Sequence, residues 1–206
     1  MDIVRYNQLF PHLIPHLPGL DGTGGEALML QAIRSGAREF CRRTEAWREE
    51  LDPIDIEDGT VAYTLDPVYS AEIVRIVEVR INTESGVDEG TEGALVDPLL
   101  YRFQPRTNVL TLADCLEPGT DVTDGLDVEV ALVPKFGADE IAEDFYALWA
   151  ETLVAAAIAS MKGIAGKPWT DPKGEEKYHN HYRRGLCRAL REKDQEGRPE
   201  GIGITA

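Results

Sequence analysis

Four arginines near the C-terminus have the clearest potential for chemistry in this sequence: Arg183, Arg184, Arg188 and Arg191. A guanidinium presents paired N–H groups that match the oxygens of a carboxylate or a phosphate. Basic clusters on helices are most often solvated faces or ion pairs between subunits. We therefore expect these arginines to contact protein in preference to nucleic acid.

The other candidate motifs lack the spacing that catalysis or metal binding requires. Pro15 interrupts the helix that would align His12 with His16, while His179 and His181 point to different helix faces. The stretch 163–167 has its glycines too close together for a phosphate loop, and 121–125 misses the register of a calcium loop. No nucleophile motif is present. The sequence predicts no catalytic residues, no metal and no cofactor.

Charge argues against binding to DNA or to a membrane. The 206 residues include 21 basic and 37 acidic side chains, which gives a net charge of −16. Such a chain repels phosphate backbones and anionic lipids. The acids concentrate in residues 52–135, where 18 acidic side chains face 5 basic ones. Three cysteines without C-x-x-C spacing, and an N-terminus unlike a signal peptide, favour a reducing cytosol.

Hydrophobic periodicity predicts three main helices. Apolar residues recur every three or four positions over 26–51 and again over 139–161, and a third helix is predicted over about 173–193. Between the first two helices the pattern changes to short β-type runs at 61–65, 73–81, 109–112 and 128–133, separated by turn residues. Strands in succession indicate an antiparallel sheet, sandwich or small barrel.

These elements predict an α+β fold, a bundle of three main helices with an inserted antiparallel β module and an extended C-terminal arm. The predicted domains are 1–51 with 136–196 (helical), 52–135 (β module) and 197–206 (arm). Complementary stripes on the first two helices define a predicted helical core. Its members are Leu30, Ile33, Phe40 and Trp47, packed on Phe145, Leu148, Thr152 and Ala155.

Two stretches resemble head–tail connector (adaptor) proteins of tailed bacteriophages. Residues 28–47, followed by Asp52-Pro53-Ile54, resemble the first helix of that family, which also resembles the tubular tail protein of short-tailed phages. The turn 166–172, with Tyr178, Tyr182 and the two arginines that follow, resembles the last helix and its lead-in. The order of elements agrees along the whole chain, while these specific stretches cover about a quarter of it.

The resemblance implies a structural virion protein without enzymatic activity. It would form a ring of generally twelve copies, between the portal protein and a tail or nozzle protein. DNA would pass through the ring without sequence-specific binding. The ring would be assembled in the host cytoplasm and located at the head–tail interface of the virion. Some relatives are credited with cell-wall hydrolase activity, so a virion-associated peptidoglycan hydrolase is the alternative. A binding module unrelated to virions is a third.

Two contact surfaces are predicted for such a ring. Portal binding is assigned to the four arginines and to Ile202 and Ile204, whose spacing places both on one face of an extended strand. Tail binding is assigned to the polar loop 84–93, because loops positioned by a sheet are common contact elements. The loop residues are Glu84, Ser85, Asp88, Glu89 and Glu92.

Overall fold

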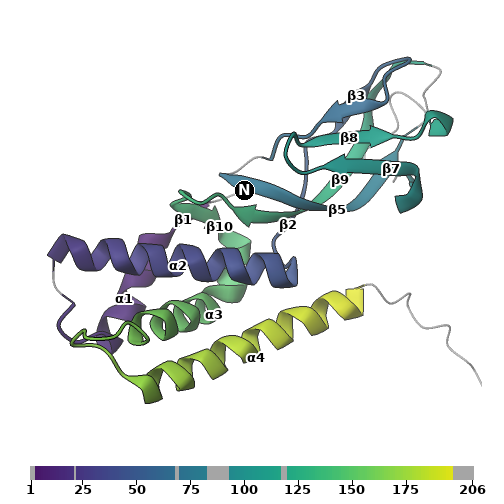
Figure 1. The fold of residues 1–206 in the computed structure, drawn as a ribbon. Helices are drawn as coiled ribbons and strands as arrows, with labels where there is room; N and C mark the ends of the chain where they lie inside the picture. Colours follow the sequence, from purple (N-terminus) through teal and green to yellow (C-terminus); the bar gives the residue numbers. More distant parts are fainter. Residues whose placement is uncertain (1–2, 21, 68–69, 83–92, 117–119, 197–206) are drawn as a thin grey trace, which may run out of the picture. The chain divides into compact units, whose positions relative to one another are not determined.

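A computed structural model describes residues 3–20, 22–67, 70–82, 93–116 and 120–196. The chain divides into two compact units (Figure 1). We call residues 1–46 with 134–206 the helical unit and residues 47–133 the β unit. The predicted tail-binding loop residues, together with Ile202 and Ile204 of the arm, lie outside the described residues.

The helical unit contains three long helices and a short two-stranded sheet. Strand β1 (Ile3–Arg5) pairs antiparallel with β10 (Glu140–Ala142). Two short 3-10 helices, η1 (Tyr6–Leu9) and η2 (Ile14–His16), flank a single-turn helix. The α-helices are α1 (Phe10–Leu13), α2 (Gly22–Thr44), α3 (Glu143–Lys162) and α4 (Pro172–Glu196).

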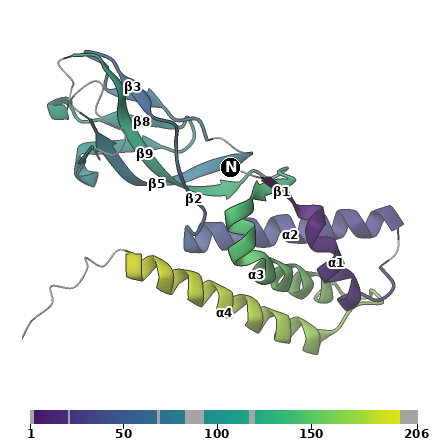
Figure 2. The same ribbon diagram turned by 180° about the vertical axis from the view of Figure 1, so that it is seen from behind.

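Helix α3 packs against both α2 and α4, as the two opposite views show (Figures 1 and 2). On α2, Phe40 is fully buried, and its ring centroid lies 5.9 Å from that of Phe145 and 5.0 Å from that of Trp149. Close helix contacts need small residues: a Cβ atom on Gly36 would lie 2.9 Å from Ala156 Cβ. Aromatic packing and close backbone approach thus define the core of this unit.

The β unit is built from antiparallel strands that curl into a half-barrel. One sheet has the order β2-β9-β5-β6, with β3 also pairing with β9, and a three-stranded sheet has the order β4-β8-β7. Short 3-10 turns occur at η3 (Pro98–Leu100) and η4 (Asp114–Leu116). The strands are β2 (Arg48–Glu50), β3 (Ile54–Ile56), β4 (Ala62–Thr64), β5 (Ala71–Ile81), β6 (Ala94–Leu95), β7 (Tyr101–Gln104), β8 (Val109–Leu112) and β9 (Val122–Pro134).

The predicted fold class is wrong. The described residues form four α-helices and three antiparallel sheets, so the protein is sheet-rich and not a three-helix bundle with a small β insertion. The error arose because strands of two to four residues, such as β1, β2 and β10, are too short to show a period of their own. Pairing with a distant segment determines their conformation, and no local pattern records that pairing.

The first long helix also ends earlier than predicted. Helix α2 stops at Thr44, Glu45 has a positive φ of 54°, and residues 48–50 form strand β2, where the prediction had continuous helix to Leu51. Trp47 and Leu51 are buried, but within the β unit. Their spacing fits the helical stripe by coincidence, because they flank β2 and positions four apart in an extended chain also lie on one face. By contrast, β4, β5, β8 and β9 confirm the strands predicted at those positions.

The predicted helical core needs further correction. Ile33, Phe40 and Phe145 are buried, and Leu30 is half-buried. Leu148 was placed in the core, yet it is 59% exposed, so that prediction is wrong. The period placed Leu148 and Thr152 on the side of α3 that faces the first long helix, whereas Thr152 lies against Gly185 of α4. It could not show that this part of the stripe lies at the rim.

We expect Phe40→Ala to lower the free energy of unfolding by about 3–5 kcal/mol, because it removes a fully buried ring from between two others. Leu148→Ala is the matched control and should change it by less than about 0.5 kcal/mol. Urea denaturation followed by circular dichroism measures both. A large loss for Leu148→Ala would place that side chain back in the core.

Gly185 should tolerate no side chain. A Cβ atom there would lie 2.4 Å from Thr152 Oγ1 and Cγ2, so we expect Gly185→Val to destabilise the fold by about 1–3 kcal/mol through overpacking. Gly24→Val is the control, because nothing lies within 4 Å of a Cβ at that position. Thermal denaturation compares the two. Equal effects would contradict the close contact between α3 and α4.

Candidate docking surface

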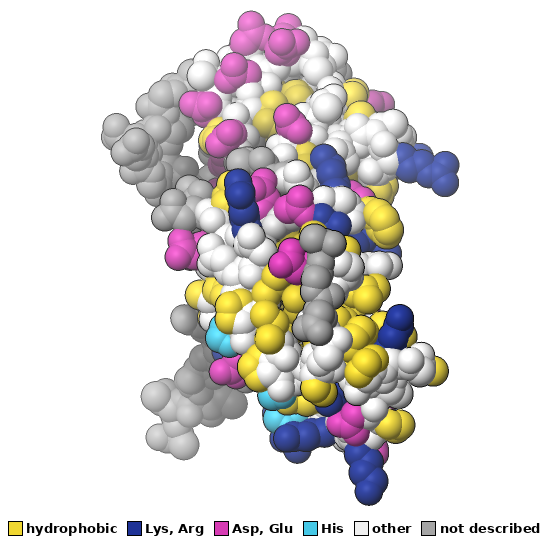
Figure 3. Space-filling model, turned by 90° about the vertical axis from the view of Figure 1, so that its left-hand side faces the viewer, with side chains coloured by type: hydrophobic (Ala, Val, Ile, Leu, Met, Phe, Trp, Pro, Cys, Tyr) yellow, Lys and Arg dark blue, Asp and Glu magenta, His cyan; other side chains and the backbone are white. Residues whose placement is uncertain are grey.

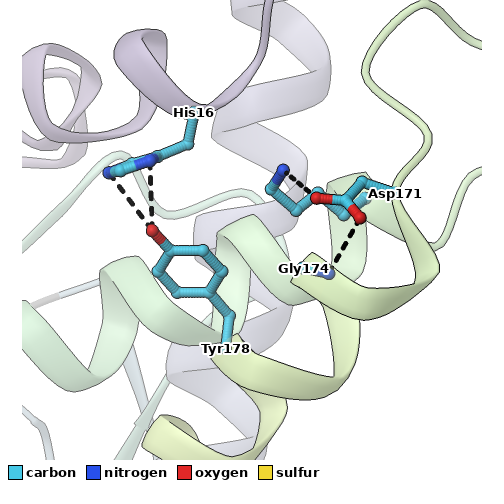
Figure 4. A network of polar contacts seen from close by, with 5 residues as sticks. His16, Asp171, Gly174 and Tyr178 are labelled. Carbon is cyan, nitrogen blue, oxygen red and sulfur yellow. Dashed lines mark hydrogen bonds and ion pairs between the residues drawn. The ribbon is translucent and has the colours of Figure 1, made fainter.

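Helix α4 carries all four arginines of the predicted portal site and is fixed at its start by Asp171. The Asp171 carboxylate accepts a hydrogen bond from the Gly174 backbone N–H at 2.9 Å and forms an ion pair with Lys162 Nζ at 2.9 Å (Figure 4). These two interactions hold the pKa of Asp171 below its usual range, the backbone hydrogen bond being the larger cause. Asp171 therefore acts as a cap that also joins α4 to the end of α3.

Two further contacts fix the direction of α4. The Tyr178 hydroxyl lies 3.0 Å from Nδ1 of His16, which joins the first turns of α4 to η2 (Figure 4). Near the other end, Lys193 Nζ lies 2.6 Å from Glu45 Oε2, just beyond the end of α2. Helix α4 is thus held at both ends by polar contacts from different elements.

Only a narrow side of α4 is buried. Tyr182, Leu186 and Ala189 are 3%, 5% and 3% exposed and face the helical core. Burial raises the pKa of the Tyr182 hydroxyl. The remaining circumference of this helix carries charged and polar side chains that are largely exposed. An amphipathic helix with so narrow an apolar side has wide faces available for contacts.

One exposed face of α4 carries a row of cations, which we call the basic stripe. Its members are spaced by 4, 7, 4 and 3 residues, which places them on one side of a helix. All of them are exposed. The basic stripe consists of Lys173, Lys177, Arg184, Arg188 and Arg191.

Within the basic stripe, Arg188 is the residue with the most defined position. Its Nε donates a hydrogen bond to Glu192 Oε1 at 2.8 Å, and its guanidinium lies 5.0 Å from the centroid of the Trp149 ring. Trp149 is buried in α3, and Leu148 just before it and Glu151 two residues after it are exposed. The contact with Trp149 fixes the Arg188 side chain against α3.

The structure brings three of the four predicted arginines together and separates the fourth. Arg183 is exposed but lies about 100° around the helix from Arg184, outside the basic stripe. Among the described residues, Arg183, Arg184 and Arg191 form no ion pair. The sequence prediction missed Lys173 and Lys177, although the spacing of 4 and 7 residues toward Arg184 was available as a signal.

A second charged surface lies on the β unit, where β3 meets the start of β9, and we call it the acidic edge. The backbone N–H of Asp58 donates to Asp121 Oδ1 at 2.8 Å, and that of Asp124 donates to Asp55 Oδ1 at 2.9 Å. Figure 3 shows acidic side chains gathered on the β unit. The acidic edge consists of Asp55, Glu57, Asp58, Asp121 and Asp124, all exposed.

The two units differ strongly in charge. The β unit contains 5 basic and 20 acidic side chains, a net −15, while the helical unit contains 16 basic and 17 acidic ones, a net −1. Nearly all of the net negative charge therefore belongs to the β unit. The helical unit instead displays local positive surface along α4.

Other candidate chemistry finds no support in the described part of the chain. No group of three or more His, Cys, Asp or Glu residues there could hold a metal ion. Cys41 is fully buried, and burial raises the pKa of its thiol, which disfavours the reactive thiolate. None of the helices described is long and apolar enough to cross a membrane. Comparison with models of protein families and with curated proteins finds no match to this chain.

We expect stability to fall in the order wild type, Asp171→Asn, Asp171→Ala at pH 7. Asparagine keeps an oxygen for the Gly174 N–H but loses the ion pair with Lys162, whereas alanine loses both. The native pKa of Asp171 is lowered, so the carboxylate contributes fully above the ordinary aspartate pKa of about 3.9 and less as the pH falls through the lowered value. The difference between wild type and Asp171→Asn should therefore shrink below about pH 4.

Urea denaturation at several pH values measures this dependence. Asp144→Asn, an exposed acid in the first turn of α3, provides a control for general charge effects. If the Asp171 and Asp144 variants had the same pH dependence, the cap and the ion pair would contribute nothing specific.

Proposed function

We propose that this protein is a structural component of a tailed bacteriophage virion that forms a ring between the portal and the tail. In this role it has no catalytic activity, and it connects the DNA-filled head to the tail while lining the channel through which DNA leaves. The portal lies on one side of the ring and a tail or nozzle protein on the other.

The observation that carries the proposal is the packing of the two stretches that resemble connector proteins. Phe40, from the first stretch, has its ring centroid 6.5 Å from that of Tyr182, which belongs to the second. Both side chains are buried in the core of the helical unit. Residues that resemble one family at two distant places in the sequence therefore support one another in a single core, which is consistent with a shared fold.

Surface charge supports the same role. A channel for DNA must let the phosphate backbone pass without holding it, and an acidic surface repels phosphates. The β unit, at a net −15, has that property. A protein that bound DNA for recognition would instead need a broad basic surface and contacts to base edges.

The exposed faces of α4 are a third support. A ring subunit needs surfaces for two neighbours in addition to those for its other partners. Helix α4 is held at both ends yet buried along only one narrow side, so it offers rigid faces to other chains. Rigid elements lower the entropy lost on assembly.

The segment 197–206, which follows α4, is the expected portal contact. Deleting it should leave a folded protein that no longer binds portal rings, because the two isoleucines it contains can add to a sheet edge on a partner only as an extended strand. Ile202→Ser with Ile204→Ser should reproduce the deletion. Arg198→Gln with Glu200→Gln keeps the isoleucines and should bind normally.

Electron microscopy of each variant mixed with portal rings of the same virus, with circular dichroism as a check on folding, measures the effect. Unchanged portal binding after the deletion would rule out this contact. A ring that is absent both alone and with portal would contradict the proposed function itself. A clearing zone in a peptidoglycan gel would favour the hydrolase instead.

A further inference from the structure

The basic stripe is a helix face with cations that lack an equal number of anions nearby. It extends over 19 residues of α4, from Lys173 to Arg191, and these 18 steps correspond to roughly 27 Å at about 1.5 Å per residue. Of its five members, Arg188 has a carboxylate partner in Glu192. Several like charges aligned on a rigid helix repel one another, and an acidic partner relieves that repulsion.

We propose that the basic stripe of one copy binds the acidic edge of the β unit of a second copy. The occupant is identified by charge complementarity: five of the 16 cations of the helical unit are aligned in the basic stripe, and the β unit has a net charge of −15. This inference rests on the proposed ring and names the surfaces that join its subunits.

The acidic edge is arranged to receive arginines. Asp55 and Asp121 each use Oδ1 to accept a backbone N–H, which fixes the carboxylate while its Oδ2 has no hydrogen-bond partner among the described residues. Glu57, Asp58 and Asp124 extend the row and are exposed. Carboxylates held in place by the backbone lose little side-chain entropy when an arginine binds them.

The contact pairs two different surfaces, so every copy has one of each. An interface of this kind is heterologous, and it produces a closed ring when the rotation between neighbours closes. Portal binding then depends on the segment 197–206 and not on the arginines of the stripe.

A second copy fits better than nucleic acid. Phosphates would also match the stripe, but the whole chain has a net charge of −16 and repels a polyanion at long range. Within a ring, by contrast, the β unit of the neighbouring copy presents its carboxylates to the stripe at high local concentration.

The experiment uses two full-length variants, each with one surface disabled. Lys177→Glu, Arg184→Glu and Arg191→Glu reverse the stripe and spare Arg188, which packs on Trp149. Glu57→Lys, Asp58→Lys and Asp121→Asn disable the acidic edge, and asparagine keeps the oxygen that accepts the Asp58 N–H.

A matched control for the stripe variant has the same charge change, three cations replaced by glutamate, at other positions. Arg5→Glu, Lys135→Glu and Arg183→Glu alter three exposed cations of the helical unit outside the stripe. Sedimentation velocity of each protein at low and high salt measures assembly, and circular dichroism confirms folding. The wild type and the control should assemble at low salt and dissociate as salt increases.

Each disabled variant alone should associate at least about a hundredfold more weakly, since like charges then face each other across the contact. Mixing the two variants should restore assembly beyond a dimer, because the two intact surfaces match and the two reversed surfaces are again opposite in charge. Assembly of the stripe variant at wild-type affinity, or a mixture that stays monomeric, would overturn the inference while leaving the ring intact.

A wild type that never assembles would overturn the proposed ring and this inference together. A stripe that binds duplex DNA in place of the β unit would also overturn it.

Discussion

The attachment of helix α4 along one narrow side is the constraint on which the rest of the helical unit depends. At its start, Asp171 caps the helix and pairs with Lys162, whose side chain is only 11% exposed. Leaving that ammonium without a carboxylate in so buried a position would be strongly unfavourable. The ion pair therefore does more than stabilise one helix end, because it also connects the end of α3 to the start of α4 across the turn between them.

Helix α4 both packs on the core and presents charged side chains to solvent, and opposite sides of the helix carry these two roles. Tyr182, Leu186 and Ala189 supply the apolar contacts that hold α4 on the core, and Gly185 allows it to approach Thr152 closely. Because a close contact uses little width, most of the helix surface stays available for charged side chains. The basic stripe lies on this available surface, opposite the buried side.

Sequence periodicity predicted the long elements and failed on the short ones, for a physical reason. Helices α3 and α4 and the strands β5 and β9 contain enough residues for a period to be visible, and the prediction placed them well. Strands β1 and β10 have three residues each and exist because they pair across more than a hundred residues of sequence. A local pattern contains no information about such a pairing, so the fold class was predicted wrongly.

The charged surfaces could also be predicted only in part from the sequence. The arginine cluster was evident in the sequence, but the division of α4 into a stripe and a separate Arg183 required knowledge of which residues are buried. The acidic edge was not predicted, because Asp55 and Asp121 lie 66 residues apart and meet only when β3 pairs with β9.

The separation of charge between the units follows from what each must bury. Helix α3 is apolar around most of its circumference, and α2 and α4 together carry 11 basic and 7 acidic side chains, an excess of cations. The β unit has an apolar interior and loops and strand faces that carry acids without compensating bases. Such an excess of like charge destabilises a unit on its own. A neighbour that supplies cations would relieve this repulsion, so assembly and stability would be coupled through the same side chains.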